Sequence, residues 1–130
     1  MPEVRIATAA DIEACVAIVD RLSDYFTPDV ADKVRADWPR CRTWVLVDRD
    51  TVAGFAEVEV RSRVVAEILW AAVEPERRGN GLGTVLVDRV LALRADEGLS
   101  LVEVKTLDES AGYEPYEGTV AFWESRGFVK

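Results

Sequence analysis

The chain has 130 residues, a length that fits one domain with a buried core, so we predict a single domain over residues 1–130. Its formal net charge of -8 argues against nucleic acid or an anionic membrane as a partner and favours cationic small molecules or basic peptides. The sequence contains no histidine and only two cysteines, which excludes zinc sites and histidine-based triads, so we expect no metal.

The N-terminus lacks the basic segment and apolar run of a secretory signal, and two cysteines make no disulfide framework. We therefore expect a cytoplasmic protein. The longest apolar run, residues 68–73, is far shorter than the roughly 20 residues that span a bilayer, so we expect no membrane partner.

Residues 1–40 predict one strand and two helices. Residues 4–7 form the strand, and Thr8 and Asp11 have the spacing of a capping box that begins a helix. Helical spacing then places Cys15 in the core, together with Ile12, Val16, Val19, Leu22 and Phe26. A second helix restarts at Thr27 and Pro28, and Pro39 stops it after an apolar face of Val30, Val34 and Trp38.

The pattern changes to that of strands at residue 43. Residues 43–47, 52–60 and 64–73 predict an antiparallel meander, with connections at residues 48–50 and 61–63. Residues 82–97 then predict a helix, and residues 101–107 a buried strand. A strand, glycine loop, helix and strand in this order predict a right-handed crossover that pairs two roughly parallel strands.

The loop between strand and helix carries alternating glycines, Gly79, Gly81 and Gly83, preceded by Arg77 and Arg78. Such a loop at a helix N-terminus is typical of a phosphate-binding site. A Walker motif would need a lysine between Gly83 and Thr84, and a Rossmann loop would need glycine in place of Thr84 and no antiparallel meander. A plain surface turn would leave the two arginines without a role.

These residues resemble the GNAT superfamily of N-acetyltransferases. Arg78, Gly81 and Gly83 match the family's loop of the form Arg/Gln-x-x-Gly-x-Gly/Ala, Val73 and Pro75 match the residues before it, and residues 122–128 match a second motif, Phe-Trp-Glu-Ser-Arg-Gly-Phe. The resemblance implies an α/β (α+β) GNAT acyltransferase fold: a central mixed, mostly antiparallel sheet flanked by helices, with a last helix over residues 117–126 and shortened C-terminal strands.

The resemblance also implies acetyl-CoA as co-substrate. The pantetheine would lie in a wedge between the fourth and fifth strands, beside Ala71, Ala72 and Val73, with Trp123 packing beside the cofactor. The pyrophosphate would bind backbone amides of the loop: Arg78, Gly79, Asn80, Gly81, Leu82, Gly83 and Thr84.

The expected reaction is direct attack of an amine on the thioester, with a strand amide near Ala71 or Ala72 as oxyanion donor. Glu67 is the candidate base. If residues 61–63 form a tight hairpin loop, Val60 pairs with Val64 and Glu57 lies opposite Glu67, so the two carboxylates would share a proton or await a cation. The alternative is a solvated polar stripe of Glu57 and Glu59.

The proton donor to the departing thiolate is less directly indicated, because Trp123 stands where many family members have a tyrosine. Tyr116 is the candidate acid, and Tyr113 is an alternative. We expect a small-molecule or peptide primary amine as acceptor, bound near Tyr25, Phe26 and Trp38 and residues 108–116, although those aromatics could equally belong to the core.

The chain ends at Lys130, where family members usually continue through further strands. Either the chain is shortened, or a second copy completes the sheet at residues 101–107, which would make a homodimer. The missing tyrosine and the early end leave a second hypothesis open: a non-catalytic acyl-CoA-binding or sensor domain.

Overall fold

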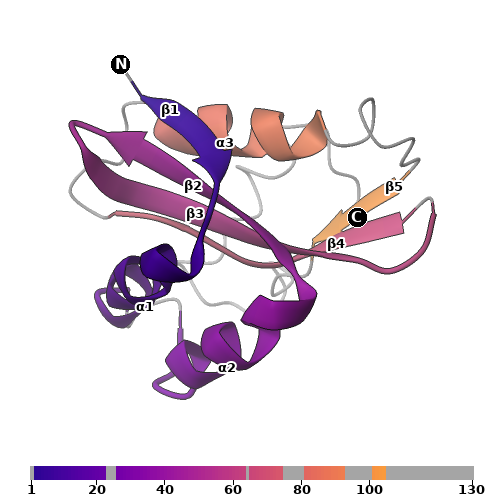
Figure 1. Ribbon diagram of the computed structural model, residues 1–130, viewed down its shortest axis with the longest axis horizontal. Coiled ribbons are helices and arrows are strands. Elements are labelled where there is room, and N and C mark those ends of the chain that lie inside the picture. The colour runs from indigo at the N-terminus through magenta and orange to yellow at the C-terminus, as the bar shows by residue number, and fades with distance from the viewer. Residues whose placement is uncertain (1, 23–25, 64, 75–80, 93–100, 105–130) are drawn as a thin grey trace, which may run out of the picture.

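A computed structural model describes residues 2–22, 26–63, 65–74, 81–92 and 101–104 (Figure 1). Its elements, in chain order, are β1 (Glu3–Ile6), η1 (Ala9–Asp11), α1 (Ile12–Asp20), α2 (Val30–Asp37), η2 (Trp38–Arg40), β2 (Arg42–Asp48), β3 (Thr51–Val60), β4 (Val65–Val73), α3 (Leu82–Leu91) and β5 (Leu101–Val104). They occur in the predicted order. The predicted residues 93–97, 105–107 and 117–126 lie outside the described residues.

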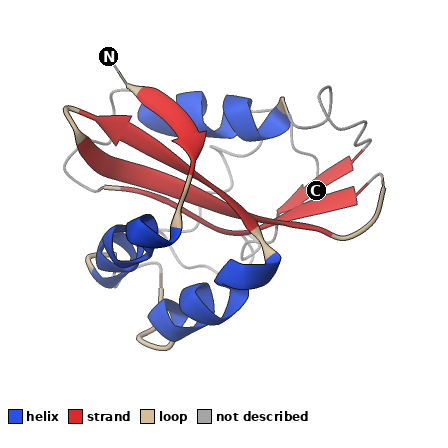
Figure 2. Cartoon of the chain, viewed as in Figure 1, coloured by secondary structure: helices blue, strands red, loops and turns tan. Residues whose placement is uncertain are grey.

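The strands form one five-stranded sheet in the order β1-β2-β3-β4-β5 (Figure 2). The first three pairings are antiparallel, and β4 and β5 pair in parallel. The predicted meander and the parallel crossover pair are thus confirmed, and so is the mixed, mostly antiparallel α+β fold. None of the helices in the described part of the chain is long and apolar enough to cross a bilayer.

Helices cover both faces of the sheet, α3 on one side and α1 with α2 on the other (Figure 1). On the α3 face, Val58 and Ile68 of the strands pack with Leu86 of the helix. On the α1/α2 face, Phe55 packs with helical side chains that include Cys15. Cys15 is fully buried, as predicted, and burial raises the pKa of its thiol to about 12.

The first helix begins as predicted, through a capping box over Thr8 and Asp11. The Thr8 amide donates to Asp11 Oδ2 at 2.8 Å, and Arg5 Nη1 approaches the same oxygen at 2.9 Å. The box lies on the short turn η1, which leads directly into α1. The second helix begins at Val30, two residues beyond Pro28, and Trp38 and Pro39 lie in the short helix η2.

The predicted register between the third and fourth strands is wrong. Glu59 lies opposite Glu67, whereas Glu57 lies opposite Trp70. One cause is the turn, in which the Arg61 and Ser62 amides both donate to the Val65 carbonyl, at 2.8 and 3.2 Å, so the loop closes later than predicted.

The second cause is a β-bulge in β4. Val58 lies opposite Ile68 and Glu57 opposite Trp70, so Leu69 is an extra residue with no register partner on β3. Beyond the bulge the strands return to regular pairing, with Ala71 opposite Ala56.

Candidate functional site

The predicted phosphate loop leads into α3 through a glycine in the left-handed conformation. Gly81 caps the helix with φ of 74°, a value that a side chain disfavours. A Cβ built there meets nothing within 4 Å among the described residues, so backbone conformation and not crowding requires this glycine.

The N-terminus of α3 has the properties of an anion site. The amides of a helix's first turn have no acceptor within the helix, and the helix dipole is positive there. Gly81, Leu82, Gly83 and Thr84 lie together at this terminus, as predicted, and the buried Leu82 side chain anchors it to the core on the α3 face. Arg78, Gly79 and Asn80 lie outside the described residues.

Among the described residues, the strand that leads to this loop pairs with β5 over its first part. Val65–Ile68 of β4 lie opposite Leu101–Val104 of β5. Ala71, Ala72 and Val73 lie beyond this paired part, toward the loop, and pair with β3 on their other side. The predicted wedge would open here, and it remains a prediction because residues 105–107 lie outside the described residues.

The bulge at Leu69 stands at the point where the described β4–β5 pairing ends. Bulges redirect backbone groups and are common beside active sites. Backbone amides from Leu69 onward therefore join those of Ala71 and Ala72 as candidate oxyanion donors. The sequence carries no glycine or proline that could have indicated this bulge.

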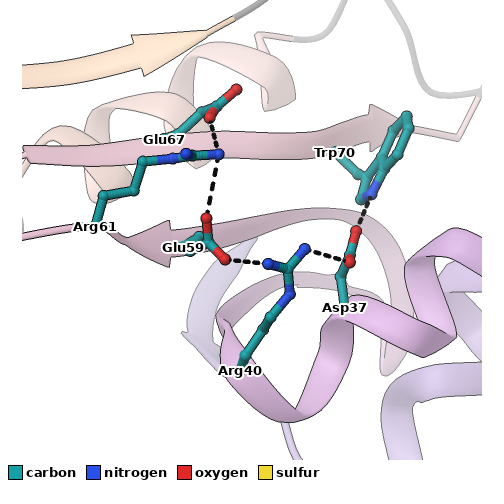
Figure 3. Close-up of polar contacts among 6 residues, drawn as sticks. All are labelled: Asp37, Arg40, Glu59, Arg61, Glu67 and Trp70. Carbon is teal, nitrogen blue, oxygen red and sulfur yellow. Dashed lines mark hydrogen bonds and ion pairs between the residues drawn. The ribbon is translucent and has the colours of Figure 1, made fainter.

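On the α1/α2 face, six side chains form a connected line of polar contacts, which we call the polar line (Figure 3). Arg61 contacts both Glu67 and Glu59, the latter at 3.2 Å between Nη2 and Oε1. Trp70 donates from Nε1 to Asp37 Oδ2 at 3.0 Å. The complete line runs through Glu67, Arg61, Glu59, Arg40, Asp37 and Trp70.

The polar line changes the environment predicted for Glu67. Its carboxylate does face another one across the strands, but the partner is Glu59, and the Arg61 guanidinium bridges the two. The side chain of Glu67 is 5% exposed and that of Arg61 45% exposed, so a buried carboxylate is neutralised by a cation from the loop.

Glu57 has a different environment from the one predicted for it. It is fully buried, and neither carboxylate oxygen has a hydrogen-bond partner among the described residues. Its pKa is raised to about 8, chiefly by burial and in addition by the charge of Asp37, while Arg40 opposes the shift. The alternative of a solvated stripe is therefore wrong for Glu57. Its shared strand face with Phe55, two residues away, was the signal for this burial.

An aromatic residue occupies the register position opposite Glu57. Trp70 lies opposite Glu57 on β4, and its ring meets Phe26 edge-on with centroids 6.4 Å apart. Phe26 and Trp38 are partly buried against the core on the α1/α2 face, so both predicted acceptor-side aromatics also contribute to that core. The sequence analysis did not single out Trp70. Tyr25, Tyr113, Tyr116 and Trp123 lie outside the described residues.

A mixed sheet in which a strand of the parallel pair precedes a glycine-capped helix N-terminus defines an α+β domain with a helix terminus suited to an anionic ligand. The chain belongs to the Acetyltransferase (GNAT) family, whose model matches residues 13–128. As a member, it is an acetyl-CoA-dependent acetyltransferase. A search of curated proteins gave no match.

Solved structures of similar fold cover nearly the whole chain. Ard1 from Thermoplasma volcanium is 25% identical with a TM-score of 0.74, over 98% of this chain and 82% of that one. The ribosomal-protein-S18-alanine N-acetyltransferase from Escherichia coli is 22% identical with a TM-score of 0.78, over 100% and 79%. The aminoglycoside N-acetyltransferase AAC(6')-Iy in complex with CoA is 16% identical with a TM-score of 0.78, over 100% and 89%.

Proposed function

We propose that this protein transfers an acetyl group from acetyl-CoA to a primary amine of a small molecule or peptide by direct attack. Family membership supports acetyl-CoA as the donor. The observation that carries the proposal is the Gly81-capped N-terminus of α3, which follows the carboxyl end of β4 and offers amides to an anion.

The cofactor would span two parts of the site. Its pyrophosphate would bind the loop amides from Arg78 to Thr84, and its pantetheine would lie beside Ala71–Val73. The positive φ of Gly81 and the open space at its Cβ position fit a loop that approaches a ligand with its backbone.

The acceptor amine would approach from the α1/α2 face, where Glu67 is the proposed base. The neutral nitrogen of the amine attacks the thioester carbonyl carbon, a C–N bond forms, and the C–S bond breaks. Glu67 first takes a proton from the bound ammonium to give this neutral nitrogen, Tyr116 protonates the departing thiolate, and the second proton that the nitrogen loses passes to solvent. Backbone amides between Leu69 and Ala72 would stabilise the oxyanion.

The Arg61 guanidinium must move away from Glu67 before an acceptor amine can bind beside this carboxylate. The guanidinium lies on the loop between β3 and β4 and is 45% exposed, so it can move into solvent. An acceptor ammonium would replace one cation with another beside Glu59 and Glu67, which keeps the buried carboxylates neutralised.

The test is thiol release from acetyl-CoA against a panel of polyamines, amino acids, aminoglycosides and peptide N-termini, with thermal shift by CoA as a control. We expect CoA to raise the Tm and one acceptor class to release thiol. Stabilisation by CoA without acceptor-dependent release would favour a non-catalytic acyl-CoA-binding or sensor domain. No stabilisation by CoA would contradict both functions.

We further propose a homodimer that pairs at β5, the edge strand of the described sheet. An unpaired edge strand leaves backbone groups that a second copy can bond. Light scattering on the full chain should then give twice the 14.4 kDa monomer mass. A monomeric mass would contradict this assembly and leave the proposed reaction unaffected.

A further inference from the structure

Glu57 is a buried carboxyl that the proposed acetyl transfer does not use. It is 0% exposed, and its two oxygens have no hydrogen-bond partner among the described residues. An unpartnered polar group is costly inside a protein, and a charged one more so. Thr43, directly opposite on β2, likewise has a buried hydroxyl without a partner among the residues that the structure describes. Adjacent unsatisfied groups of this kind indicate a place for a polar ligand.

The charges around Glu57 favour a cation. Asp37 and Arg40 act on its carboxyl electrostatically, and its own charge contributes to the raised pKa values of the Cys15 and Cys41 thiols. Glu57 lies on the sheet face that packs against α1 and α2, two residues from Phe55 on the same strand.

Acidic and basic groups lie at different depths in this cluster. The side chains of Glu67, Glu59 and Asp37 are 5%, 15% and 19% exposed, whereas the two arginines are 45% and 55% exposed. The carboxylates are thus more deeply buried than the guanidinium groups. Among the six residues of the polar line, three carboxylates accompany two guanidinium groups, so a cation that approaches between the arginines would meet the more deeply buried carboxylates.

The spacing of two carboxylates suggests the shape of the ligand. Glu59 is directly opposite Glu67, and Glu57 lies two residues before Glu59 on the same strand, so Glu57 is the diagonal neighbour of Glu67. The Cβ atoms of diagonal neighbours on one face of a regular sheet are about 7–8 Å apart, which is of the order of the length of a diamine with an alkyl stem of roughly four carbons. The ring of Trp70, opposite Glu57, offers an apolar wall and a cation–π partner.

We propose that Glu57 binds the second, protonated amine of a diamine acceptor whose first amine reacts beside Glu67. This proposal rests on the proposed acetyl transfer and narrows its acceptor to amines with a further positive charge. Glu57 is then a residue that determines specificity, and Trp70 contacts the stem between the two amines.

Diamine binding should release a proton. The raised pKa of about 8 keeps Glu57 mostly protonated at neutral pH in the free protein. A bound ammonium favours the ionised carboxylate, so Glu57 loses its proton when the diamine binds. Selectivity for the diamine should therefore increase as pH rises from 6.5 to 8.5.

The experiment compares 1,4-diaminobutane with 1-aminobutane on the full chain, by calorimetric binding in two buffers of different protonation enthalpy and by acetylation kinetics. We expect the diamine to bind about tenfold more tightly or better and to release a proton at pH 7. Glu57→Gln should abolish the proton release and reduce the preference at least several-fold. Glu3→Gln, an exposed carboxylate of β1, should match wild type in both.

Equal affinity for the two amines, binding of neither, or a Glu57→Gln variant that keeps the preference and the proton release would overturn the proposal. If Glu57→Gln does not fold, the wild-type protein decides the matter: the diamine should release more protons than 1-aminobutane does, and equal release would overturn the proposal. Glu57-dependent diamine binding without acetylation of any amine would leave this binding site in place and contradict the proposed transfer instead.

Discussion

The two faces of the sheet differ in the kind of polar group that each offers to a ligand. The α3 face is an apolar core that ends at a glycine-capped helix N-terminus, so its ligand-binding groups are backbone amides. The α1/α2 face contains a buried carboxyl and a line of ion pairs, so its ligand-binding groups are side chains. Backbone amides suit a donor molecule common to a family, whereas side chains can be exchanged to suit a particular acceptor.

The largest effect should come from Glu67→Gln on the α1/α2 face. Removal of a general base lowers kcat by roughly a hundredfold or more, and CoA affinity should stay as in wild type. Steady-state kinetics across pH, together with CoA titration, measure both. Activity that is unchanged at every pH would show that Glu67 is not the base.

The next largest effect should be on the pH dependence of stability between pH 5 and pH 8. Because the pKa of Glu57 is raised to about 8 in the folded protein, the folded state keeps a proton that the unfolded state loses from about pH 4.3 upward. The free energy of unfolding should therefore fall as pH rises from 5 to 8, by a few kcal/mol, and Glu57→Gln should remove this slope. Urea unfolding at pH 5 and pH 8 measures the difference.

Asp11 provides the opposite case as a control. Arg5 holds its pKa below the usual range, so its contribution is present above the unfolded pKa and is lost as pH falls. Asp11→Asn should consequently destabilise the protein at neutral pH and less so in acid.

If the free energy of unfolding had the same pH dependence in the wild type and in Glu57→Gln, the pKa shift assigned to Glu57 would be contradicted.

A smaller effect is expected from Gly81→Ala on the α3 face. A left-handed φ of 74° costs a side-chain-bearing residue about 1–2 kcal/mol, and the added Cβ points into open space. Thermal unfolding should show a loss near that size, and CoA affinity should fall about tenfold if the loop shifts. Gly81→Asn, which tolerates this conformation better, should lose less stability; equal stability of all three proteins would count against the cap.

The smallest effect on kinetics is expected from Arg61→Gln. The guanidinium competes with an acceptor amine for Glu67, so its removal should lower the acceptor KM a few-fold, and the loss of the cation between Glu59 and Glu67 should lower stability. Arg63→Gln, an exposed position in the same loop, is the matched control. A KM that rises or stays constant in Arg61→Gln would show that Arg61 does not occupy the acceptor position.

Much of the fold was predictable because it follows from local patterns. Strand alternation, the capping box at Thr8 and the glycine loop placed β1 to β4 and the start of α3, and the order of elements predicted the parallel β4–β5 pair. Local sequence patterns do not determine how many residues a turn contains. Loop closure at Val65 moved the β3–β4 register by two residues, which left Glu67 on its predicted face but gave it Glu59 as partner.

The site was less predictable because its electrostatics depend on tertiary contacts. The bulge at Leu69 follows from packing of the sheet and has no signal in the sequence. The Arg61 bridge between two carboxylates depends on the observed register. The shift in the pKa of Glu57 follows from burial, which its strand position next to Phe55 could have indicated.

The central claim is that the donor and the acceptor bind to different faces of the sheet. Amide NMR titration of the full chain, first with CoA and then with 1,4-diaminobutane, tests it most directly. We predict that CoA changes the amide chemical shifts of Gly81–Thr84 and Leu69–Val73, and that the diamine changes the amide chemical shifts of Glu57, Glu59 and Glu67. Shifts by CoA confined to the α1/α2 face, or shifts by both ligands at the same amides, would contradict separate donor and acceptor faces.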